Sequence, residues 1–198
     1  MKKHTLFLYA CVCVCACTML VLTGCKREQT AESATDSDTL VSVVNDSTLW
    51  GHLGIDTGMS ALEFITDEGD TLELYRTDPY SGQDGILTGE IRNFTDRFAV
   101  TISNDGETMR TAINATQLAN TWKTDKGTID IHENGTISSE GLPYDGWKLW
   151  NGHILLSSQQ QQEYGIINRV DTMDIMLLSN DSLVIRNPFG QTTSYSNK

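Results

Sequence analysis

The feature that most constrains the fold of this chain is a series of short runs in which apolar and polar residues alternate, each followed by a tight turn. From about Val41 onward these runs are five or six residues long, and Gly, Asn or Asp follows them. Residues 61–66 and 71–76, on either side of the turn 67–70, show the pattern in its simplest form. Alternation with a period of two is typical of half-buried strands, and such turns join antiparallel neighbours. The pattern therefore predicts an all-β fold built of hairpins rather than a parallel sheet.

The rest of the chain repeats this pattern. The further predicted hairpins pair 86–92 with 97–103, 127–131 with 136–138, 147–150 with 153–157, and 172–178 with 183–186. Residues 114–119 are the one convincing helical turn, with Asn114 as its N-cap and Gln117 at the capping-box position. Because a domain boundary falls most naturally at this turn, we predict two small antiparallel β-barrel or barrel-like domains, residues 41–117 and residues 118–198.

The first residues have a different character. Met1-Lys2-Lys3-His4 is basic, residues 5–22 are uncharged and mostly apolar, and Leu22-Thr23-Gly24-Cys25 ends the run. A basic start, an apolar stretch and small residues before a cysteine are typical of a bacterial lipoprotein signal peptide. We therefore predict that residues 1–24 are a signal peptide, that the Cys25 thiol receives a diacylglyceryl group, and that the new amino terminus is acylated. The alternative is an uncleaved membrane anchor, since about 18 to 20 apolar residues can span a bilayer.

The cysteines agree with the lipoprotein interpretation. The chain has five, and the four besides Cys25 all lie inside the predicted signal, at Cys11, Cys13, Cys15 and Cys17. Removal of the signal would leave one cysteine, and that one would carry lipid, so no disulfide is expected. Residues 26–38 contain no large apolar side chain and cannot contribute to a core. We therefore interpret residues 25–40 as a flexible tether between the lipid and the folded part.

The charge of the chain argues against several kinds of partner. There are 26 acidic and 14 basic residues, a formal net charge of −12, and the basic residues form no cluster. Nucleic acids and anionic membrane surfaces are bound through clustered positive charge. We therefore expect no nucleic acid partner, and we expect contact with the membrane only through the lipid on Cys25.

The sequence shows no pattern that indicates catalysis or a metal site. It has no serine elbow, Cys–His pair or glycine-rich phosphate loop, so we expect neither an enzyme nor a cofactor. Asp130 and His132 are two residues apart and share a strand face, but Ile129 and Ile131 claim the buried side. The pair should therefore lie on the solvated face. The acidic turn 67–70 lacks the ligand set of a calcium loop.

Four aromatic residues of the second half are the candidate contact residues: Trp122, Tyr144, Trp147 and Trp150. They could line a ligand pocket or plug a small barrel. Trp147 and Trp150 lie on opposite faces of one predicted strand, so one of them should point outward. An exposed tryptophan would mark a contact surface.

From Leu118 onward the chain resembles the short lipocalin-like domain of Bacteroidetes-type lipoproteins. The resemblance covers roughly the last 80 residues and is carried by 118–123, Asn134-Gly135, 142–147, 152–156, 174–178 and 181–185. Asn120 stands before Trp122 where lipocalins have glycine. The resemblance implies a small antiparallel barrel closed by Trp122, although about 80 residues cannot supply the eight long strands of a full lipocalin. Residues 41–117 resemble, in pattern only, a five-stranded OB-like barrel.

These observations lead to one expected function and one alternative. We expect an envelope lipoprotein that serves as a non-enzymatic structural or protein-interaction module, with an envelope protein as its partner. The alternative is a carrier that binds a small apolar ligand inside the lipocalin-like barrel. No acidic run follows Cys25, and in one group of Gram-negative anaerobes such a run directs lipoproteins to the cell surface. This favours the outer membrane on its periplasmic side, with surface exposure as the alternative.

Overall fold

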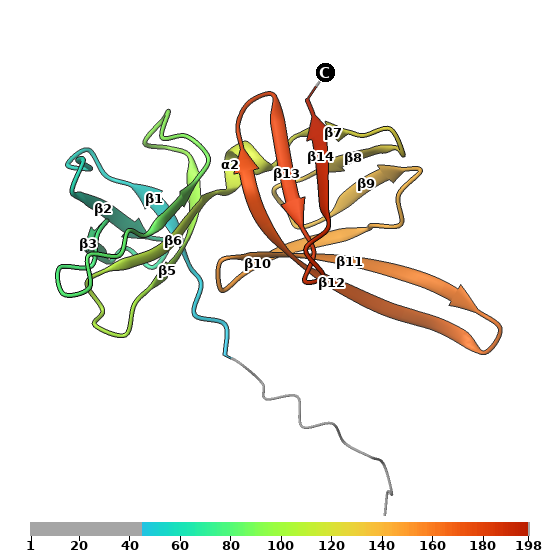
Figure 1. Cartoon of the computed structure of the whole chain (residues 1–198), viewed down its shortest axis with the longest axis horizontal. Helices are drawn as coiled ribbons and strands as arrows, with labels where there is room; N and C mark the ends of the chain where they lie inside the picture. The colour runs from blue at the N-terminus through green and yellow to red at the C-terminus, as the bar shows by residue number, and fades with distance from the viewer. Residues whose placement is uncertain (1–44, 198) are drawn as a thin grey trace, which may run out of the picture. The chain divides into compact units, whose positions relative to one another are not determined.

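Two β-sheets account for nearly all of the regular structure in this protein (Figure 1). The structure is a computed structural model that describes residues 45–197. The predicted signal peptide, Cys25 and the tether lie outside these residues. The first sheet contains β1 (Leu49–Leu53), β2 (Ala61–Thr66), β3 (Thr71–Tyr75), β4 (Ile86–Thr88), β5 (Arg97–Ile102) and β6 (Met109–Asn114). The second contains β7 (Thr121–Lys123), β8 (Thr128–Ile131), β9 (Ile137–Glu140), β10 (Gly146–Trp150), β11 (His153–Gln162), β12 (Gly165–Leu178), β13 (Ser182–Arg186) and β14 (Thr192–Ser196).

The first sheet has the strand order β3-β2-β1-β5-β6-β4. Strands β1, β2 and β3 follow one another as hairpins and β5 returns beside β1, which is the arrangement of a Greek key. A parallel bridge between Tyr75 and Thr108 joins the end of β3 to the start of β6. This bridge therefore joins five of the strands into a ring.

The core of this first sheet follows the predicted alternation. Leu62, Phe64 and Leu74 are fully buried, and Leu72 packs against them. They share their cluster with Leu53, Phe98, Val100, Met109 and Ala112. Since this cluster is made only of residues from the first sheet, the sheet has a hydrophobic core of its own.

The predicted pairing of 86–92 with 97–103 is wrong. Strand β4 ends at Thr88 and pairs in parallel with β6, while β5 pairs with β1 and β6. After β4 the chain passes through Gly89, whose φ of +92° is the left-handed conformation that glycine tolerates. The backbone of Glu90 then bonds to the side chains of Gln117 and Asn114 instead of a strand. Alternation indicated strands here, but the return of β5 beside β1 decided which neighbour each strand has.

The second sheet is a nearly closed barrel of eight strands in the order β10-β11-β12-β13-β14-β7-β8-β9. An antiparallel bridge between Thr136 and Gly146 joins its two edges, β9 and β10. As expected, about 80 residues do not supply eight long strands. They do supply eight strands. The barrel reaches eight strands because six of them are only three to five residues long.

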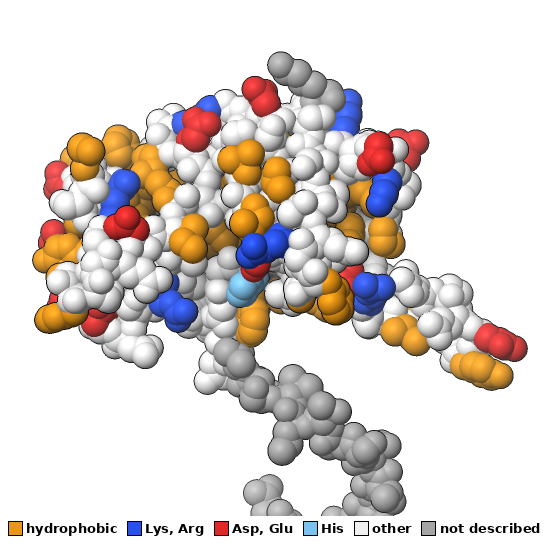
Figure 2. Space-filling model, in the orientation of Figure 1, with side chains coloured by type: hydrophobic (Ala, Val, Ile, Leu, Met, Phe, Trp, Pro, Cys, Tyr) orange, Lys and Arg blue, Asp and Glu red, His pale blue; other side chains and the backbone are white. Residues whose placement is uncertain are grey.

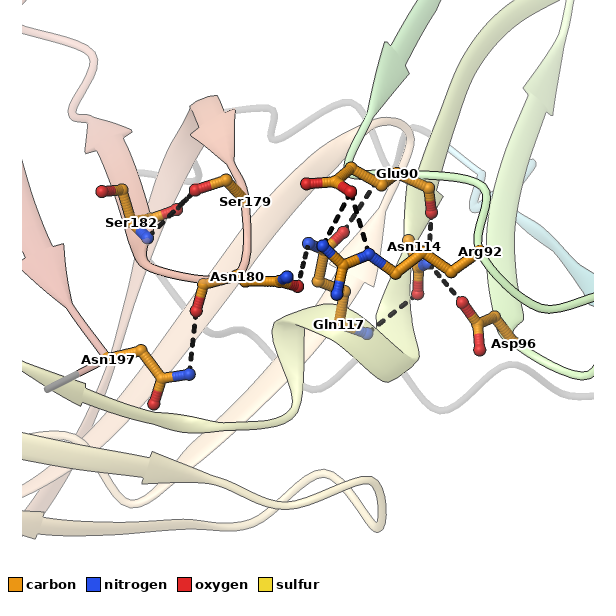
Figure 3. Close-up of polar contacts among 9 residues, drawn as sticks. All are labelled: Glu90, Arg92, Asp96, Asn114, Gln117, Ser179, Asn180, Ser182 and Asn197. Carbon is orange, nitrogen blue, oxygen red and sulfur yellow. Dashed lines mark hydrogen bonds and ion pairs between the residues drawn. The ribbon is translucent and has the colours of Figure 1, made fainter.

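Helix α2 (Ala115–Leu118) connects the two sheets, and Asn114 is its N-cap as predicted. The Gln117 backbone nitrogen donates to the Asn114 Oδ1 atom at 2.8 Å (Figure 3). Gln117 does not complete a capping box. Its side chain instead accepts from the Glu90 backbone nitrogen and donates to Asn180 in the turn between β12 and β13. One glutamine thereby ties the loop after β4 to the barrel.

Strands β11 and β12 extend well beyond the rest of the barrel (Figure 1). Strand β10 pairs with β11 only as far as Ser157, and β13 pairs with β12 only from Asp174. Residues 159–170 therefore form a two-stranded projection, which we call the arm. The sequence pattern predicted strands that stop at 157 and restart at 172, because residues 159–167 do not alternate between apolar and polar.

Candidate functional site

Trp122 lies in the buried core of the barrel and not on a surface. Its side chain is fully buried, and its indole nitrogen donates to the Leu118 carbonyl oxygen at 2.9 Å. The surrounding buried cluster includes Leu118, Ile129, Ile131, Leu149, Ile154, Leu156, Leu183, Ile185 and Tyr195. Trp122 is therefore a buried core residue of the barrel.

Trp147 and Tyr144 lie at the edge of the same core. Trp147 is 8% exposed, and its indole nitrogen donates to the His132 carbonyl oxygen at 2.7 Å. Tyr144 is half-buried, and burial raises its pKa, with the nearby Asp171 carboxylate adding to the effect. Burial also raises the pKa of Tyr195 to about 12. Both phenols therefore stay neutral at physiological pH and can donate hydrogen bonds there.

Trp150 lies on the other face of β10. Trp147 and Leu149 are buried and Lys148 is exposed, and the partly buried Trp150 lies on the same outer face of β10 as Lys148. It lines an open cleft of about 350 Å³. The cleft, which we call the Trp150 cleft, is bounded by Asn45, Ser47, Thr101, Arg110, Trp150, Asn151 and His153.

The wall of the Trp150 cleft is held by a turn. Asn151 and Gly152 have φ values of +49° and +86°, the type I′ geometry that an Asn-Gly pair favours in two-residue hairpins. The Asn151 Oδ1 atom accepts from the Ser47 backbone nitrogen at 2.8 Å and from its hydroxyl at 2.7 Å. The Asn151 backbone nitrogen bonds to the Thr48 hydroxyl at 2.8 Å. One asparagine thus holds Ser47 and Thr48, which precede β1, against the barrel.

We expect Asn151→Ala to lower the free energy of unfolding by about 1 to 2 kcal/mol, because it removes side-chain hydrogen bonds and places alanine at positive φ. Asn151→Gly is the matched variant, since glycine tolerates this φ but also lacks the hydrogen bonds. Urea unfolding of the three proteins separates the two contributions. Protease cleavage near Ser47 should increase in both variants. Unchanged cleavage in both would contradict the role of Asn151 in holding Ser47 and Thr48 against the barrel.

A row of charged side chains continues from the cleft across the outer barrel wall. The His153 Nδ1 atom lies 2.8 Å from one carboxylate oxygen of Asp174, and the Arg186 guanidinium lies 2.8 Å from the other. The hydrogen bond from Arg186, supported by His153, lowers the pKa of Asp174 below its ordinary 3.8. Asp174 therefore remains ionised and orients the imidazole at the edge of the cleft.

This ion pair should make a small, pH-dependent contribution to stability. Because the pKa of Asp174 is lowered by folding, its contribution is present above about pH 4 and is lost as the pH falls through the folded-state value. Near neutral pH we expect the free energy of unfolding of the wild type to exceed that of Asp174→Asn by at most about 1 kcal/mol. The difference is small because the Asp174 side chain is 38% exposed and solvent screens the pair. Thermal unfolding between about pH 6 and pH 2 should show this difference disappearing. A difference independent of pH would contradict the assignment.

Arg110 gives the Trp150 cleft its positive charge. Arg110 is one of the residues that line the cleft, and it takes part in none of the ion pairs formed within residues 45–197. Beside it the cleft offers an indole ring, an imidazole and the polar groups of asparagine and serine. These groups can bind a carboxylate or an amide next to an apolar surface. The sequence pattern identified Trp150 only, because Arg110 and Ser47 come from distant segments and carry no local signal.

The remaining predicted polar sites are solvated. The His132 Nε2 atom lies 3.9 Å from the Asp130 Oδ2 atom, and both side chains are about two-fifths exposed. The pair therefore faces outward, as predicted. Over residues 45–197 no three side chains of the metal-binding types gather in one place. No helix in this described part is long and apolar enough to cross a bilayer.

Comparison with known proteins agrees with the barrel. Residues 116–198 match the model of a family described as lipocalin-like. A crystal structure of a lipocalin-like protein from Bacteroides thetaiotaomicron VPI-5482 is 27% identical to this chain, with a TM-score of 0.35, and the match covers 41% of this chain and 96% of that one. A search of curated proteins gave no match. The chain is therefore lipocalin-like in sequence from Thr116 to its end, the part that contains the eight-stranded barrel.

Proposed function

We propose that this protein is a lipid-anchored, non-enzymatic interaction module of the bacterial cell envelope. In this proposal Cys25 carries the lipid, and the Trp150 cleft contacts a protein partner. The observation that carries the proposal is the packing of the barrel. Trp122, Leu149 and Ile154, from three different strands, are all at most 1% exposed. Pockets for small molecules usually enclose about 300 Å³ or more, and a centre packed with such side chains has no comparable room.

The Trp150 cleft has the composition of a protein contact. Tryptophan and arginine are the residues most enriched among side chains that dominate binding energy. Trp150 is partly buried, Arg110 is exposed, and Asn151 holds the wall of the cleft. A partner segment that places an apolar side chain on the indole and a carboxylate beside Arg110 would satisfy both groups. Arg110 would give this carboxylate a local partner of opposite charge on a chain whose net charge is strongly negative.

A second candidate function is favoured by apolar side chains around the barrel core. Leu142, Tyr144, Met173 and Ile175 are only partly buried, and they pack against this core. Together with the lipocalin-like match, this supports a carrier of a small apolar ligand. Such a ligand would have to displace core side chains, which costs packing energy.

The anchor is tested by Cys25→Ala. We expect this variant to lose membrane attachment and to keep its signal unprocessed by the lipoprotein route, because the acylated thiol is missing. Each buried methylene contributes about 0.8 kcal/mol, so several acyl chains on one residue make a durable anchor. Metabolic labelling with a fatty acid is the measurement, and label retained on the variant would refute the anchor.

The contact surface is tested by crosslinking in native membranes followed by mass spectrometry of the bound protein and of co-purifying lipids. We expect Trp150→Ala and Arg110→Glu to lose one crosslinked protein that the wild type retains. Phe189→Ala is the matched control, because Phe189 is an aromatic residue that is 88% exposed and lies outside the cleft. An apolar molecule bound at one copy per barrel, unaffected by the cleft variants, would overturn the proposal in favour of the carrier.

A further inference from the structure

We infer that the arm is a self-association element, in which β12 of one copy pairs antiparallel with β12 of a second copy about a two-fold axis at Asn168. This goes beyond the proposed function, because it concerns a different surface and a different partner. The inference rests on the free edge of β12, on the phase of its hydrogen bonds and on the distribution of charge along the arm.

The arm leaves both of its edges without a strand partner. From residue 159 to residue 170 each strand pairs only with the other, since β10 ends opposite Ser157 and β13 ends opposite Asp174. A two-stranded hairpin is at best marginally stable in water, and an exposed edge is a template for a further strand. The arm therefore has the geometry of a sheet that lacks its next strand.

The exposed apolar side chains of the arm lie mainly on β12. Ile166, Ile167 and Val170 are 62%, 49% and 58% exposed, and Tyr164 at the tip is 96% exposed. Hydrophobic surface is visible along the projecting hairpin (Figure 2). Strand β11 presents only glutamines over 159–162. Burial of apolar surface therefore favours the edge of β12 over the edge of β11.

The alternation of backbone hydrogen bonds along β12 shows which of its residues point their N–H and C=O groups away from β11. The Ser157 carbonyl accepts from the Asp145 nitrogen, on the β10 side, so Ser158 and its alternate neighbours bond to β12. In the pairing of β11 with β12, Ser158 is opposite Arg169 and Gln160 is opposite Ile167. Because bonding alternates along an antiparallel strand, the backbone groups of residues 166, 168 and 170 point to the free edge.

A two-fold axis at Asn168 satisfies all three of these residues at once. Asn168 then faces Asn168 of the second copy, and Ile166 faces Val170 of the second copy. About six backbone hydrogen bonds form between the two strands. The apolar pairs lie directly opposite on one face of the four-stranded arm sheet, the arrangement that stabilises neighbouring strands. An axis moved by one residue along the strand would leave one of the three residues unpaired.

The charges of the arm select a second copy of this chain as the occupant. The whole chain carries a net charge of −12, so two copies repel one another over most of their surface. Between Tyr164 and Val170 the only charged side chain is Arg169, and Asp171 of the same strand pairs with it at 2.8 Å. Two copies can therefore meet along this segment without placing carboxylates opposite each other. The small interface, well below the roughly 1,200 Å² of stable complexes, implies a transient dimer.

The test is disulfide formation by Asn168→Cys in the full chain, in isolated membranes treated with an oxidant. In a bonded antiparallel pair the two Cα atoms are about 5.5 Å apart, within the range of a disulfide. Gln159→Cys is the matched control, because Gln159 lies directly opposite Asn168 on the same face of the arm but belongs to the other edge. We expect at least about fivefold more disulfide-linked dimer from Asn168→Cys than from Gln159→Cys or from the wild type, given this geometry.

A second variant tests the backbone pairing. Adding Val170→Pro to Asn168→Cys removes an N–H that points to the free edge and that the hairpin itself does not use, so the arm stays paired. We expect the dimer yield to fall by at least about threefold, because two edge hydrogen bonds are lost. The inference is overturned by equal crosslinking of both cysteine variants, by no crosslinking, by a yield that Val170→Pro leaves unchanged, or by a crosslink to a different protein. Loss of the Trp150-dependent partner leaves these results unaffected, so the two proposals fail separately.

Discussion

Trp122→Ala is expected to unfold the barrel while the first sheet stays folded. The side chain is fully buried among strands of the barrel, and its indole nitrogen bonds to the Leu118 carbonyl. Truncating such a tryptophan leaves a large cavity and costs about 3 to 5 kcal/mol. A domain has only about 5 to 15 kcal/mol of stability in total. The first sheet should survive because it has a core of its own, centred on Phe64 and Phe98.

Limited proteolysis followed by intact-mass analysis measures this outcome. We expect cleavage in the barrel of the variant, with a protected fragment that contains β1 to β6. Trp150→Ala is the matched control, because it removes the same side chain from a partly buried position on the outer face of β10. It should lower the free energy of unfolding by no more than about 1.5 kcal/mol, since less apolar area is lost. Full protection of Trp122→Ala would refute the plug and would strengthen the carrier as the candidate function.

Asn114→Ala is expected to be the second most damaging of these substitutions. Asn114 is fully buried, caps α2 through Oδ1, and donates from Nδ2 to Asp96 at 2.9 Å and to the Glu90 carbonyl at 2.8 Å (Figure 3). Alanine removes the cap and leaves the carboxylate of Asp96, which is 8% exposed, without this donor. The combined loss is about 2 to 4 kcal/mol.

Two further variants separate the cap from the buried network. Asn114→Asp keeps an acceptor for the Gln117 nitrogen but loses the donor and places a second carboxylate beside Asp96, so it should be at least as damaging as alanine. Gln117→Ala removes only the side-chain bonds to Glu90 and Asn180, which are more exposed, and should cost about 1 kcal/mol. Urea unfolding midpoints rank the three. A stable Asn114→Asp protein would show that the cap alone accounts for the role of Asn114.

The candidate site was partly readable from the sequence. The alternation of Trp147, Lys148, Leu149 and Trp150 required one tryptophan to face outward, and Trp150 is the one that does. The Asn151-Gly152 pair indicated a tight turn, and its positive φ values have that geometry. The partners of Trp150 in the cleft could not be predicted. Arg110 and Ser47 approach it only because β6 and the segment before β1 fold beside the turn after β10.

Sequence alone therefore determined the local structure of this protein. Alternation with a period of two, turn residues and the cap at Asn114 depend on residues a few positions apart, so the hairpin β2–β3 and helix α2 follow from the sequence directly. The tertiary structure decided the parallel pairing of β4, the closure of both rings, the eight strands of the barrel and the free arm. Each of these depends on which distant strand is available to pair, and backbone hydrogen bonds between strands carry no signature of side-chain identity. The arm is the clearest example, because its strands continue past their neighbours without any pattern in the sequence to announce it.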